Sequence, residues 1–504
     1  MGNRFQVSDR FADGAQYIGG RLRPGTSEDE HSVIDPATGK SVHTYRLAST
    51  ADVDEAVAAA KEAFPGWSGA TPGERSDALH RLAGVLAERA EEFARVESLQ
   101  CGKPIKLTRE FDVPGTVDNT AFFAGAARHL QGQSAGEYSG DHTSYVRREA
   151  VGVVGSIAPW NYPLQMAAWK ILPAVAAGNT IVLKPAELTP LTSLMFAQAA
   201  TEAGIPDGVV NVVTGAGRTA GEHLVGHPDV AMTSFTGSTG VGRRVAEIAT
   251  ATVKRLHLEL GGKAPFVVFD DADLEAAAQG AVAASLINSG QDCTAATRAY
   301  VQRPLFDAFV ARVAELMETV RLGDPFDPST DLGPLVSHAQ RDRVAGFVER
   351  ARGYATVVTG GEAPGGELKD GAYYRPTLIT GAAQDSEVVQ SEIFGPVLVA
   401  LPFDGDDEGI RLANDTPYGL AASAWSRDVY RANRATREIK AGCVWVNDHI
   451  PIISEMPHGG YKASGFGKDM SVYSFEEYTQ VKHVMYDNTA VPAKDWHRTI
   501  FGDR

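Results

Sequence analysis

Between residues 153 and 213, short apolar runs alternate with longer segments in which apolar residues recur every three or four positions. The runs have the length of buried strands, and the periodic segments have the pattern of helices with a buried face. This alternation predicts parallel βαβ units with right-handed crossovers. We expect strands at 153–158, 180–184 and 209–213, and helices at 164–176 and 189–202.

A second alternating α/β set follows residue 264, and two stretches differ from it. The expected strands are 264–269, 298–301, 423–425 and 442–447, and the expected helices run from about 274 to 288 and from 305 to 320. Segment 132–148 has glycines and a polar alternation, which predict a β-ribbon leaving the globule. Residues 1–48 read as strands and turns, and helices are expected over 53–64 and after Pro72.

The composition is that of an acidic globular enzyme. The 47 Lys and Arg residues against 63 Asp and Glu give a net charge of -16, which disfavours nucleic acid and acidic membranes as partners. No apolar run approaches the ~18 residues of a membrane span, and no export signal is visible. The three cysteines, Cys101, Cys293 and Cys443, have no metal-ligand spacing. We therefore expect no metal site and a reducing, cytoplasmic location.

Cys293 is the candidate nucleophile. It lies between a glycine-marked turn and a run of small residues, in the segment Asn288–Arg298. The turn is expected to lead into a helix start, whose partial positive charge would favour the thiolate. The alternative is a buried structural cysteine. Upstream, Glu259 stands directly before Leu260 and two glycines, so a nucleophile and a potential base are both present.

A glycine-rich turn, Phe235–Gly242, follows a predicted strand and opens a predicted helix. Its glycine spacing differs from G-x-G-x-x-G and no Walker lysine follows, so a plain helix cap is one interpretation. Ser238 and the exposed N–H groups of a helix start would also form an anion site. Lys184 and Glu187 follow another strand, at the sheet edge where ligands bind.

The segments around Cys293 and Glu259 resemble the signatures of the NAD(P)-dependent aldehyde dehydrogenase superfamily. Leu99–Pro104, Ser156–Pro163 and Ser454–Gly460 further resemble bacterial γ-aminobutyraldehyde dehydrogenases. The resemblance implies the α/β aldehyde dehydrogenase fold, with a Rossmann-like NAD-binding domain, a second α/β catalytic domain and a small β oligomerisation arm. These three parts would cover 1–131 with 152–263, 264–470, and 132–151 with 471–504.

The same resemblance implies a covalent mechanism. Cys293 would attack the aldehyde, and the Asn161 side chain with the Cys293 backbone N–H would stabilise the oxyanion. Hydride transfer would leave a thioester, and Glu259 would activate the water that hydrolyses it. A CoA-acylating enzyme would need no such base. Asn161 by itself would be read as a turn residue before Pro163.

The implied cofactor is NAD. The Glu187 carboxylate accepts hydrogen bonds from a ribose hydroxyl and repels a 2′-phosphate, which favours NAD over NADP. Phe394 has core packing as its alternative role. The cofactor-binding residues implied are Ile157, Ala158, Pro159, Trp160, Asn161, Lys184, Ala186, Glu187, Gly217, Gly221, Phe235, Gly237, Ser238, Thr239, Val241, Leu260, Gly261, Glu392 and Phe394.

The implied substrate is 4-aminobutanal, oxidised to 4-aminobutanoate in putrescine degradation. The residues expected to line its channel are Asp112, Tyr162, Met166, Trp169, Ile287, Asp292, Thr294 and His458. Alternatives are betaine aldehyde or a broad range of aldehydes, a cofactor-independent cysteine hydrolase, and a non-catalytic crystallin-like protein. The resemblance implies a homotetramer built as a dimer of dimers, or a homodimer.

Overall fold

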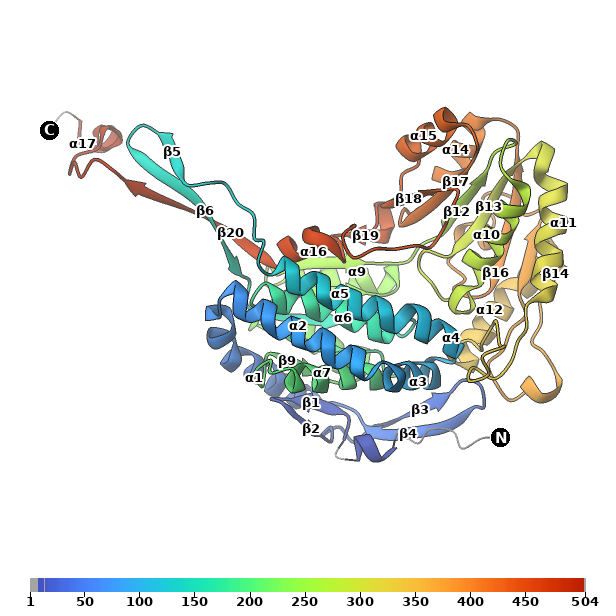
Figure 1. Cartoon of the computed structure of the whole chain (residues 1–504), viewed down its shortest axis with the longest axis horizontal. Helices are drawn as coiled ribbons and strands as arrows, with labels where there is room; N and C mark the ends of the chain where they lie inside the picture. Colours follow the sequence, from blue (N-terminus) through green and yellow to red (C-terminus); the bar gives the residue numbers. More distant parts are fainter. Residues whose placement is uncertain (1–7, 13, 503–504) are drawn as a thin grey trace.

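The chain folds into two sheet-centred units and a projecting ribbon (Figure 1). This computed structural model describes residues 8–12 and 14–502. The first unit contains an eight-stranded sheet and the second a seven-stranded sheet, while three antiparallel strands form the ribbon. The predicted α/β class is confirmed, as is the presence of two such units.

The eight-stranded sheet has its parallel strands at the centre. Both added edges, β19 on one side and β1 with β2 on the other, run antiparallel to their neighbours. The strands in spatial order are β19 (Gly465–Phe466), β11 (Arg255–Glu259), β10 (Val230–Thr236), β7 (Val153–Ile157), β8 (Thr180–Lys184), β9 (Val210–Val212), β1 (Gln16–Ile18) and β2 (Arg21–Arg23). Every strand predicted between 153 and 213 is present, within a residue or two of its expected bounds.

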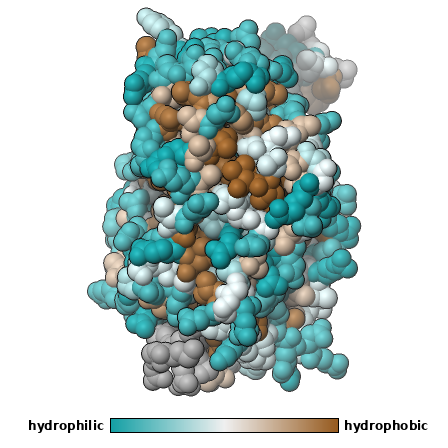
Figure 2. All heavy atoms as spheres, turned by 90° about the vertical axis from the view of Figure 1, so that its right-hand side faces the viewer, coloured by the Kyte–Doolittle hydropathy of each residue, from teal (hydrophilic) through white to brown (hydrophobic). Residues whose placement is uncertain are grey.

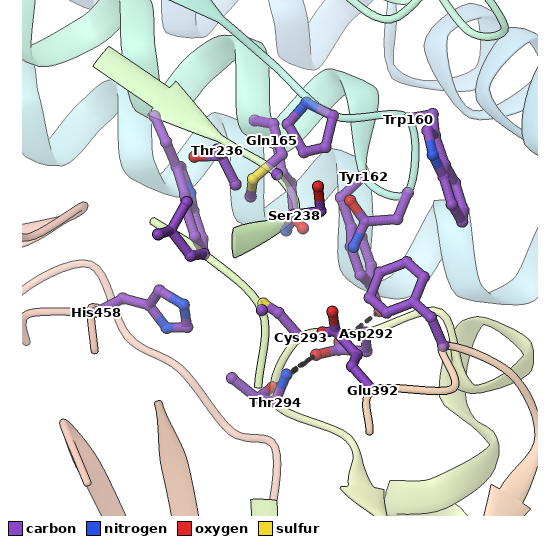
Figure 3. Close-up of a pocket in the computed structure, with 18 of the residues that line it drawn as sticks. Trp160, Tyr162, Gln165, Thr236, Ser238, Asp292, Cys293, Thr294, Glu392 and His458 are labelled. Atoms are coloured by element: carbon purple, nitrogen blue, oxygen red, sulfur yellow. Dashed lines mark hydrogen bonds between the residues drawn. The ribbon is translucent and has the colours of Figure 1, made fainter. Parts of the chain in front are cut away.

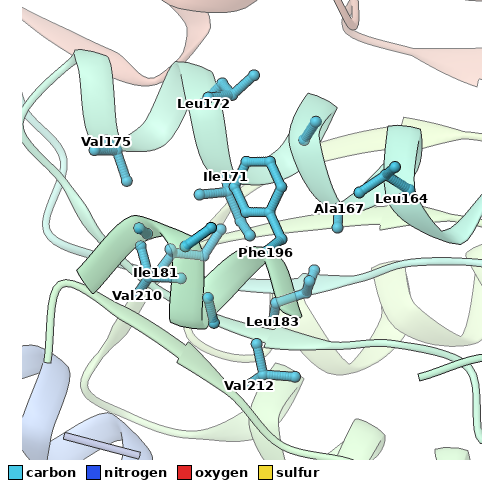
Figure 4. Packing of buried hydrophobic residues seen from close by; sticks show 14 of the residues in the cluster. Leu164, Ala167, Ile171, Leu172, Val175, Ile181, Leu183, Phe196, Val210 and Val212 are labelled. Carbon is cyan, nitrogen blue, oxygen red and sulfur yellow. The ribbon is translucent and has the colours of Figure 1, made fainter. Parts of the chain in front are cut away.

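Helices cover both faces of this sheet because alternate strand residues point to opposite sides. On one face, α6 (Pro163–Ala176) and α7 (Leu191–Glu202) pack on β8 and β9 through Ile171, Phe196 and Leu183 (Figure 4). On the other face, Val182 joins a separate cluster with Val53 and Ala56 of α1 (Thr50–Gly69). Burial of both faces explains why these strands are almost wholly apolar.

The seven-stranded sheet repeats this arrangement. Its order is β14 (Thr356–Thr359), β15 (Thr377–Thr380), β16 (Val397–Phe403), β13 (Ala296–Gln302), β12 (Ala264–Val268), β17 (Ala421–Trp425) and β18 (Cys443–Val446). One face carries α10 (Leu274–Leu286) and α11 (Arg303–Thr319), and the other carries α12 (His338–Ala351), α14 (Asp406–Asn414) and α15 (Val429–Glu438). Figure 2 looks onto the side with α11 and β14, where hydrophilic residues dominate and hydrophobic residues gather in patches near the middle.

The ribbon consists of β5 (Gly136–Ser139), β6 (His142–Ala150) and β20 (Thr479–Asp487), and it projects from the first unit (Figure 1). The expected ribbon at 132–148 is therefore present. The segment before β20 differs from the expected arm, since α16 (Ser471–Glu477) lies against the first unit and Phe475 is in its core. Likewise β19, expected with the second unit, pairs with β11 of the first sheet.

The N-terminal helices begin at side-chain caps. Ser49 forms a capping box with Asp52, and α1 extends beyond the predicted 53–64. The remaining helices are α2 (Pro72–Glu88), α3 (Ala90–Cys101), α4 (Ile105–Leu107), α5 (Val113–Ala126), α8 (Glu222–Gly226), α9 (Thr239–Thr250), α13 (Glu387–Gln390) and α17 (Arg498–Phe501). The short turns and remaining strands are η1 (Ser8–Phe11), η2 (Thr108–Asp112), η3 (Gly217–Gly221), η4 (Ile287–Gly290), η5 (Gly366–Leu368), η6 (Lys462–Ser464), η7 (Asp495–His497), β3 (Glu30–Asp35) and β4 (Lys40–Arg46).

Across residues 8–12 and 14–502, none of the helices combines the length and the apolar character that crossing a bilayer requires.

Candidate active site

The candidate site lies where the strand order of the first sheet reverses. From β7 the chain proceeds to β8 on one side, while β10 pairs with β7 on the other. Ligands of such sheets bind beyond the carboxyl ends of strands at this switch point. The loop after β7 carries Pro159, Trp160 and Asn161, and Thr236 ends β10. All four line a cavity of about 290 Å³ that faces the second unit.

Cys293 lines the same cavity from the second unit (Figure 3). It lies in a turn between η4 and β13. The expectation that a helix starts at this cysteine is wrong, because the chain goes directly into strand β13. Burial raises the pKa of the Cys293 thiol well above its ordinary value, and the nearby Asp292 raises it further. The thiol is reachable, but no helix dipole lowers its pKa.

Asn161 holds the segment that precedes this cysteine. Its side-chain amide donates to the Gln291 carbonyl at 3.1 Å, and the Asn288 amide donates to the Asn161 carbonyl at 2.9 Å. Asn288 and Ser289 both have positive φ angles, 47° and 56°, in the turn that brings Cys293 to the cavity. The structure therefore brings Asn161 and Cys293 together, although they are 132 positions apart in sequence.

Glu259 ends β11 and is 3% exposed. Neither of its carboxylate oxygens has a hydrogen-bond partner among the described residues. Burial raises its pKa well above the ordinary value, and Asp469 adds to the rise. The side chain is not part of the cavity lining, so it is withdrawn from Cys293 in this structure.

The carboxylate of Glu187 is held at the end of the first sheet, beyond β8. Its Oε1 accepts from the Gly217 backbone N–H at 2.8 Å, and its Oε2 lies 3.4 Å from the Lys184 ammonium. Lys184 also donates to the Gly215 carbonyl at 2.8 Å. At Gly221 a β-carbon would come within 3.4 Å of the Lys184 side chain. The result is a fixed, partly exposed carboxylate that can accept from a sugar hydroxyl.

The glycine-rich turn has the predicted geometry. Ser238 is the N-cap of α9, and its hydroxyl accepts from the Val241 N–H at 3.4 Å. The Gly237 N–H donates to the Glu259 carbonyl at 3.0 Å, which ties the turn to the end of β11. A β-carbon at Gly237 would come within 2.6 Å of the Phe235 ring. The helix start is therefore open to an anion above Ser238.

A second carboxylate and two aromatic rings border the middle of the cavity. The Glu392 Oε1 accepts from the Gly262 N–H at 2.9 Å, and burial raises the pKa of this carboxyl. The Phe394 ring meets the Trp160 ring edge-on at 5.2 Å. Phe394 has φ 61°, so its backbone is held in a conformation that a bulky residue rarely adopts. Gly261 has no room for a β-carbon, which would come within 2.4 Å of Glu392.

The other end of the cavity is built on α6. Tyr162, Met166 and Trp169 all line it, at the spacing of one helix face. Trp169 is fixed by the hydrogen bond from its Nε1 to Asn119 Oδ1 at 2.6 Å. His458 packs against the Trp169 ring at 5.2 Å, and burial lowers its pKa to about 4. His458 is therefore neutral near pH 7.

Asp292 is the acidic residue that lines the cavity beside Tyr162. Its Oδ1 accepts from the Thr294 N–H and hydroxyl, both at 2.7 Å, and its Oδ2 accepts from the Tyr162 hydroxyl at 2.8 Å (Figure 3). No ion pair of Asp292 is present within the described ranges. The three hydrogen bonds orient the carboxylate and leave one of its roughly four acceptor positions free.

Comparison with known proteins agrees with this geometry. The family model described as the aldehyde dehydrogenase family matches residues 23–484. This chain is an aldehyde dehydrogenase.

Solved relatives share almost the whole chain with this aldehyde dehydrogenase. PnpE from Pseudomonas sp. WBC-3, crystallised with nicotinamide adenine dinucleotide, is 41% identical, with 96% of this chain and 100% of that chain covered and a TM-score of 0.94. Betaine aldehyde dehydrogenase from Staphylococcus aureus, crystallised with NAD+, is 35% identical, with 98% of each chain covered and a TM-score of 0.94.

Two expected channel residues lie elsewhere in this aldehyde dehydrogenase. Asp112 does not line the cavity but is buried and ion-paired with Lys103 at 2.8 Å. The Lys103 ammonium lies 3.8 Å from the centre of the Tyr162 ring, so Asp112 supports the wall from behind. Ile287 is also outside the lining, because the chain turns sharply at η4. Both expectations came from a resemblance in position, which could not show which way each side chain points.

The lining also includes residues that sequence reasoning missed. They are Phe111, Gln165, Thr236, Gln340, Arg343, Ile450 and Ile452. Gln165 could have been found, since it follows Asn161 by one helical turn on α6. Ile450 and Ile452 come from an irregular loop after β18, where no periodicity marks the buried positions.

The predicted cofactor residues fall into two groups. Those that line the cavity are Pro159, Trp160, Asn161, Gly237, Ser238, Leu260, Gly261, Glu392 and Phe394. Those that lie around it, along the ends of β7, β8 and β10 and the starts of η3 and α9, are Ile157, Ala158, Lys184, Ala186, Glu187, Gly217, Gly221, Phe235, Thr239 and Val241. In the part of the chain that the structure describes, no group of three or more potential ligands could hold a metal ion.

Proposed function

We propose that this aldehyde dehydrogenase uses NAD to oxidise an ω-aminoaldehyde, 4-aminobutanal, to 4-aminobutanoate in putrescine degradation. The observation that carries the substrate class is Asp292, a carboxylate oriented by Tyr162 and Thr294 in the wall of the cavity beside Cys293. A cationic substrate group would be attracted to it, and a carboxylate-bearing aldehyde would be repelled.

Two basic side chains near this end do not oppose that attraction. Burial lowers the pKa of His458 to about 4, so this ring is neutral near pH 7. Lys103 is on the far side of the Tyr162 ring and is ion-paired with Asp112 at 2.8 Å. A primary ammonium could donate to the acceptor position that remains free on Asp292.

The chemistry that we propose begins at Cys293. Its thiolate would add to the aldehyde carbon, and the Asn161 side-chain amide and the Cys293 N–H would donate to the developing oxyanion. Such donors contribute about 3 kcal/mol each when they are fixed in place. In this structure the Asn161 amide donates to the Gln291 carbonyl at 3.1 Å, which fixes its position beside Cys293.

The residues at the ends of β8 and β10 support NAD as the cofactor. When bound, NAD supplies the hydride acceptor for the oxidation. The Glu187 carboxylate is held by the Gly217 N–H and Lys184, in a position to accept from a ribose hydroxyl. Ser238 at the start of α9 would face the pyrophosphate, and Glu392 the second ribose. The carboxylate of Glu187 would disfavour the phosphate of NADP.

Glu259 is proposed as the base for thioester hydrolysis. Its carboxylate must swing from its withdrawn position into the cavity, where it would take a proton from the attacking water. Gly459 makes room for the withdrawn position, because a β-carbon there would come within 2.4 Å of Glu259 Oε1.

We also propose a cytoplasmic homotetramer, built as a dimer of dimers. The ribbon of β5, β6 and β20 supports this assembly because it projects from the first unit with apolar residues exposed, including Val481 and Met485. The cytoplasmic location rests on the acidic composition and on three free cysteines.

Asp292→Asn tests the substrate class. We expect kcat/KM for 4-aminobutanal to fall about tenfold relative to kcat/KM for butanal, since one favourable charge pair of about 1.4 kcal/mol is lost. Butanal has the same chain length without the amine, and it corrects for any change in Cys293 reactivity. An unchanged ratio would remove Asp292 as the recognition group.

Betaine aldehyde is the second candidate. The aromatic wall of Tyr162, Trp169 and Phe111 could surround a quaternary ammonium, and a relative 35% identical to this chain is a betaine aldehyde dehydrogenase. A quaternary ammonium has no N–H to donate to Asp292. We therefore expect Asp292→Asn to affect betaine aldehyde less than 4-aminobutanal.

A further inference from the structure

His257 is a fully buried histidine with no assigned role, two residues before Glu259 on β11. Because side chains alternate along a strand, His257 and Glu259 point to the same side of the sheet. His257 Nε2 lies 3.8 Å from Glu259 Oε1 and 3.8 Å from Asp469 Oδ1. This nitrogen has no hydrogen-bond partner among the residues described.

The neighbours of the other ring nitrogen determine the tautomer. Nδ1 lies 2.7 Å from the Ser234 hydroxyl and 3.5 Å from the Lys170 ammonium. An ammonium can only donate, so Nδ1 is the acceptor. Burial lowers the pKa of His257 well below its ordinary value, with Lys170 adding to the effect, so the ring is neutral. Its single proton is then on Nε2, which faces the two carboxylates.

Of these two carboxylates, only Glu259 lacks a donor. Asp469 receives the Lys170 ammonium at 2.9 Å and 3.0 Å. Both Glu259 oxygens are without a partner in the described structure. The Nε2–H is therefore a donor without a partner, 3.8 Å from a carboxylate oxygen without one.

We propose that His257 is a positioning residue whose Nε2–H favours the ionised form of Glu259 while Glu259 is withdrawn from Cys293. This inference rests on the proposed role of Glu259 as the base. An ionised base can take a proton from water as soon as it swings into the cavity. A protonated one must first lose its proton, which would delay hydrolysis of the thioester.

Several other charged and titratable groups face His257 and Glu259. The charged and titratable groups that face the pair are Lys170 on α6, His458, Lys468 and Asp469 on the segment around β19, and Glu477 on α16. The His257 ring lies close against Gly467, where a β-carbon would come within 2.2 Å of His257 Cδ2.

Two variants distinguish the contributions of the two ring nitrogens of His257. His257→Gln places an amide donor near the Nε2 position, and His257→Asn keeps only an amide near the Nδ1 position. The acyl-enzyme is formed from radiolabelled propanal and NAD, and its loss is followed by acid quench between pH 5 and 10. When acylation is the faster step, the loss of the acyl-enzyme measures deacylation.

We expect His257→Asn to move the pH midpoint of deacylation upward by about one unit, because loss of a donor to the carboxylate raises its pKa. The plateau rate at high pH should stay within about threefold of wild type, and His257→Gln should have a midpoint near that of wild type. A merely structural role would lower the plateau in both variants without moving the midpoint.

Three results would overturn the inference: an unchanged midpoint in His257→Asn, equal upward shifts in the two variants, or a plateau lost in both. Glu259→Gln tests the underlying role separately. If Glu259→Gln still deacylates at the wild-type rate, the proposed base is wrong. If it does not deacylate while His257→Asn behaves as wild type, only the role of His257 fails.

Discussion

At the scale of single residues, charge is what distinguishes this site. The thiol of Cys293 is surrounded by acidic groups rather than by a helix start, so its pKa is raised by burial, then by Asp292, Glu392 and Glu259. The same Asp292 that would attract a cationic substrate therefore makes the nucleophile harder to ionise. A bound cation beside Asp292 would offset that penalty, which couples substrate binding to thiolate formation.

Removal of the Asp292 charge should make Cys293 easier to ionise. The thiolate is the charged form and Asp292 disfavours it, so Asp292→Asn lowers the pKa of Cys293. Alkylation by iodoacetamide should reach its half-maximal rate at a lower pH than in wild type. Mass spectrometry of the Cys293 peptide gives the rate, and Cys293→Ala is the control for alkylation of Cys101 and Cys443. A midpoint that moves upward would contradict this electrostatic account.

Glu187 should set the cofactor preference. Glu187→Gln removes the negative charge but keeps an acceptor for the ribose hydroxyl, so the repulsion of a 2′-phosphate is lost. We expect the ratio of kcat/KM for NAD to kcat/KM for NADP to fall about tenfold, mainly because kcat/KM for NADP rises. The measurement is NADH and NADPH formation at a fixed aldehyde concentration. No gain with NADP would show that Glu187 does not face the ribose.

At the scale of elements, the sequence predicted the regular parts and missed the irregular ones. The parallel strands β7 and β8 were predicted within a residue of their bounds because burial on both faces makes them continuous apolar runs. The turn of η4 could not be predicted, since its positive φ angles are held by Asn161, more than 120 positions away. Contacts between residues distant in sequence, rather than the local sequence pattern, also determine where Asp112 and Ile287 lie.

The stability of the packing around Tyr162 should depend on the buried ion pair of Lys103 and Asp112. Lys103→Met leaves the Asp112 carboxylate buried without its 2.8 Å partner. We expect a loss of about 3–5 kcal/mol in the free energy of unfolding, measured by urea denaturation. The matched variant Lys103→Met with Asp112→Leu also removes the Asp112 carboxylate and should recover part of that loss, because the buried Glu97 carboxylate, 3.6 Å from the Lys103 ammonium, still lacks its cation. Equal stability of the single variant and wild type would contradict the proposed support.

At the scale of the whole molecule, the cavity lies between the two sheet units, and the ribbon projects away from it (Figure 1). The loop after β7 comes from one unit and Cys293 comes from the other, so the site depends on how the two units pack. An element that projects with an unpaired apolar face normally packs against another surface. Here that surface would belong to a second copy of the chain.

The ribbon should therefore control assembly. Val481 and Met485 are 61% and 49% exposed and lie on the same face of β20. Val481→Asp with Met485→Asp should lower the mass measured by sedimentation from that of a tetramer toward that of a dimer or monomer. Gln480→Ala, on the opposite face of the same strand, is the control and should leave the mass unchanged. A wild-type chain that sediments as a monomer would refute the proposed assembly.

The most direct test of the account is NADH formation by the wild-type enzyme with 4-aminobutanal, betaine aldehyde and butanal, with Cys293→Ala as the blank. We predict the highest kcat/KM for 4-aminobutanal and no activity in the variant. Equal kcat/KM values for the three aldehydes would contradict the substrate class while leaving the chemistry in place. Activity that persists in Cys293→Ala would contradict the nucleophile on which the whole account depends.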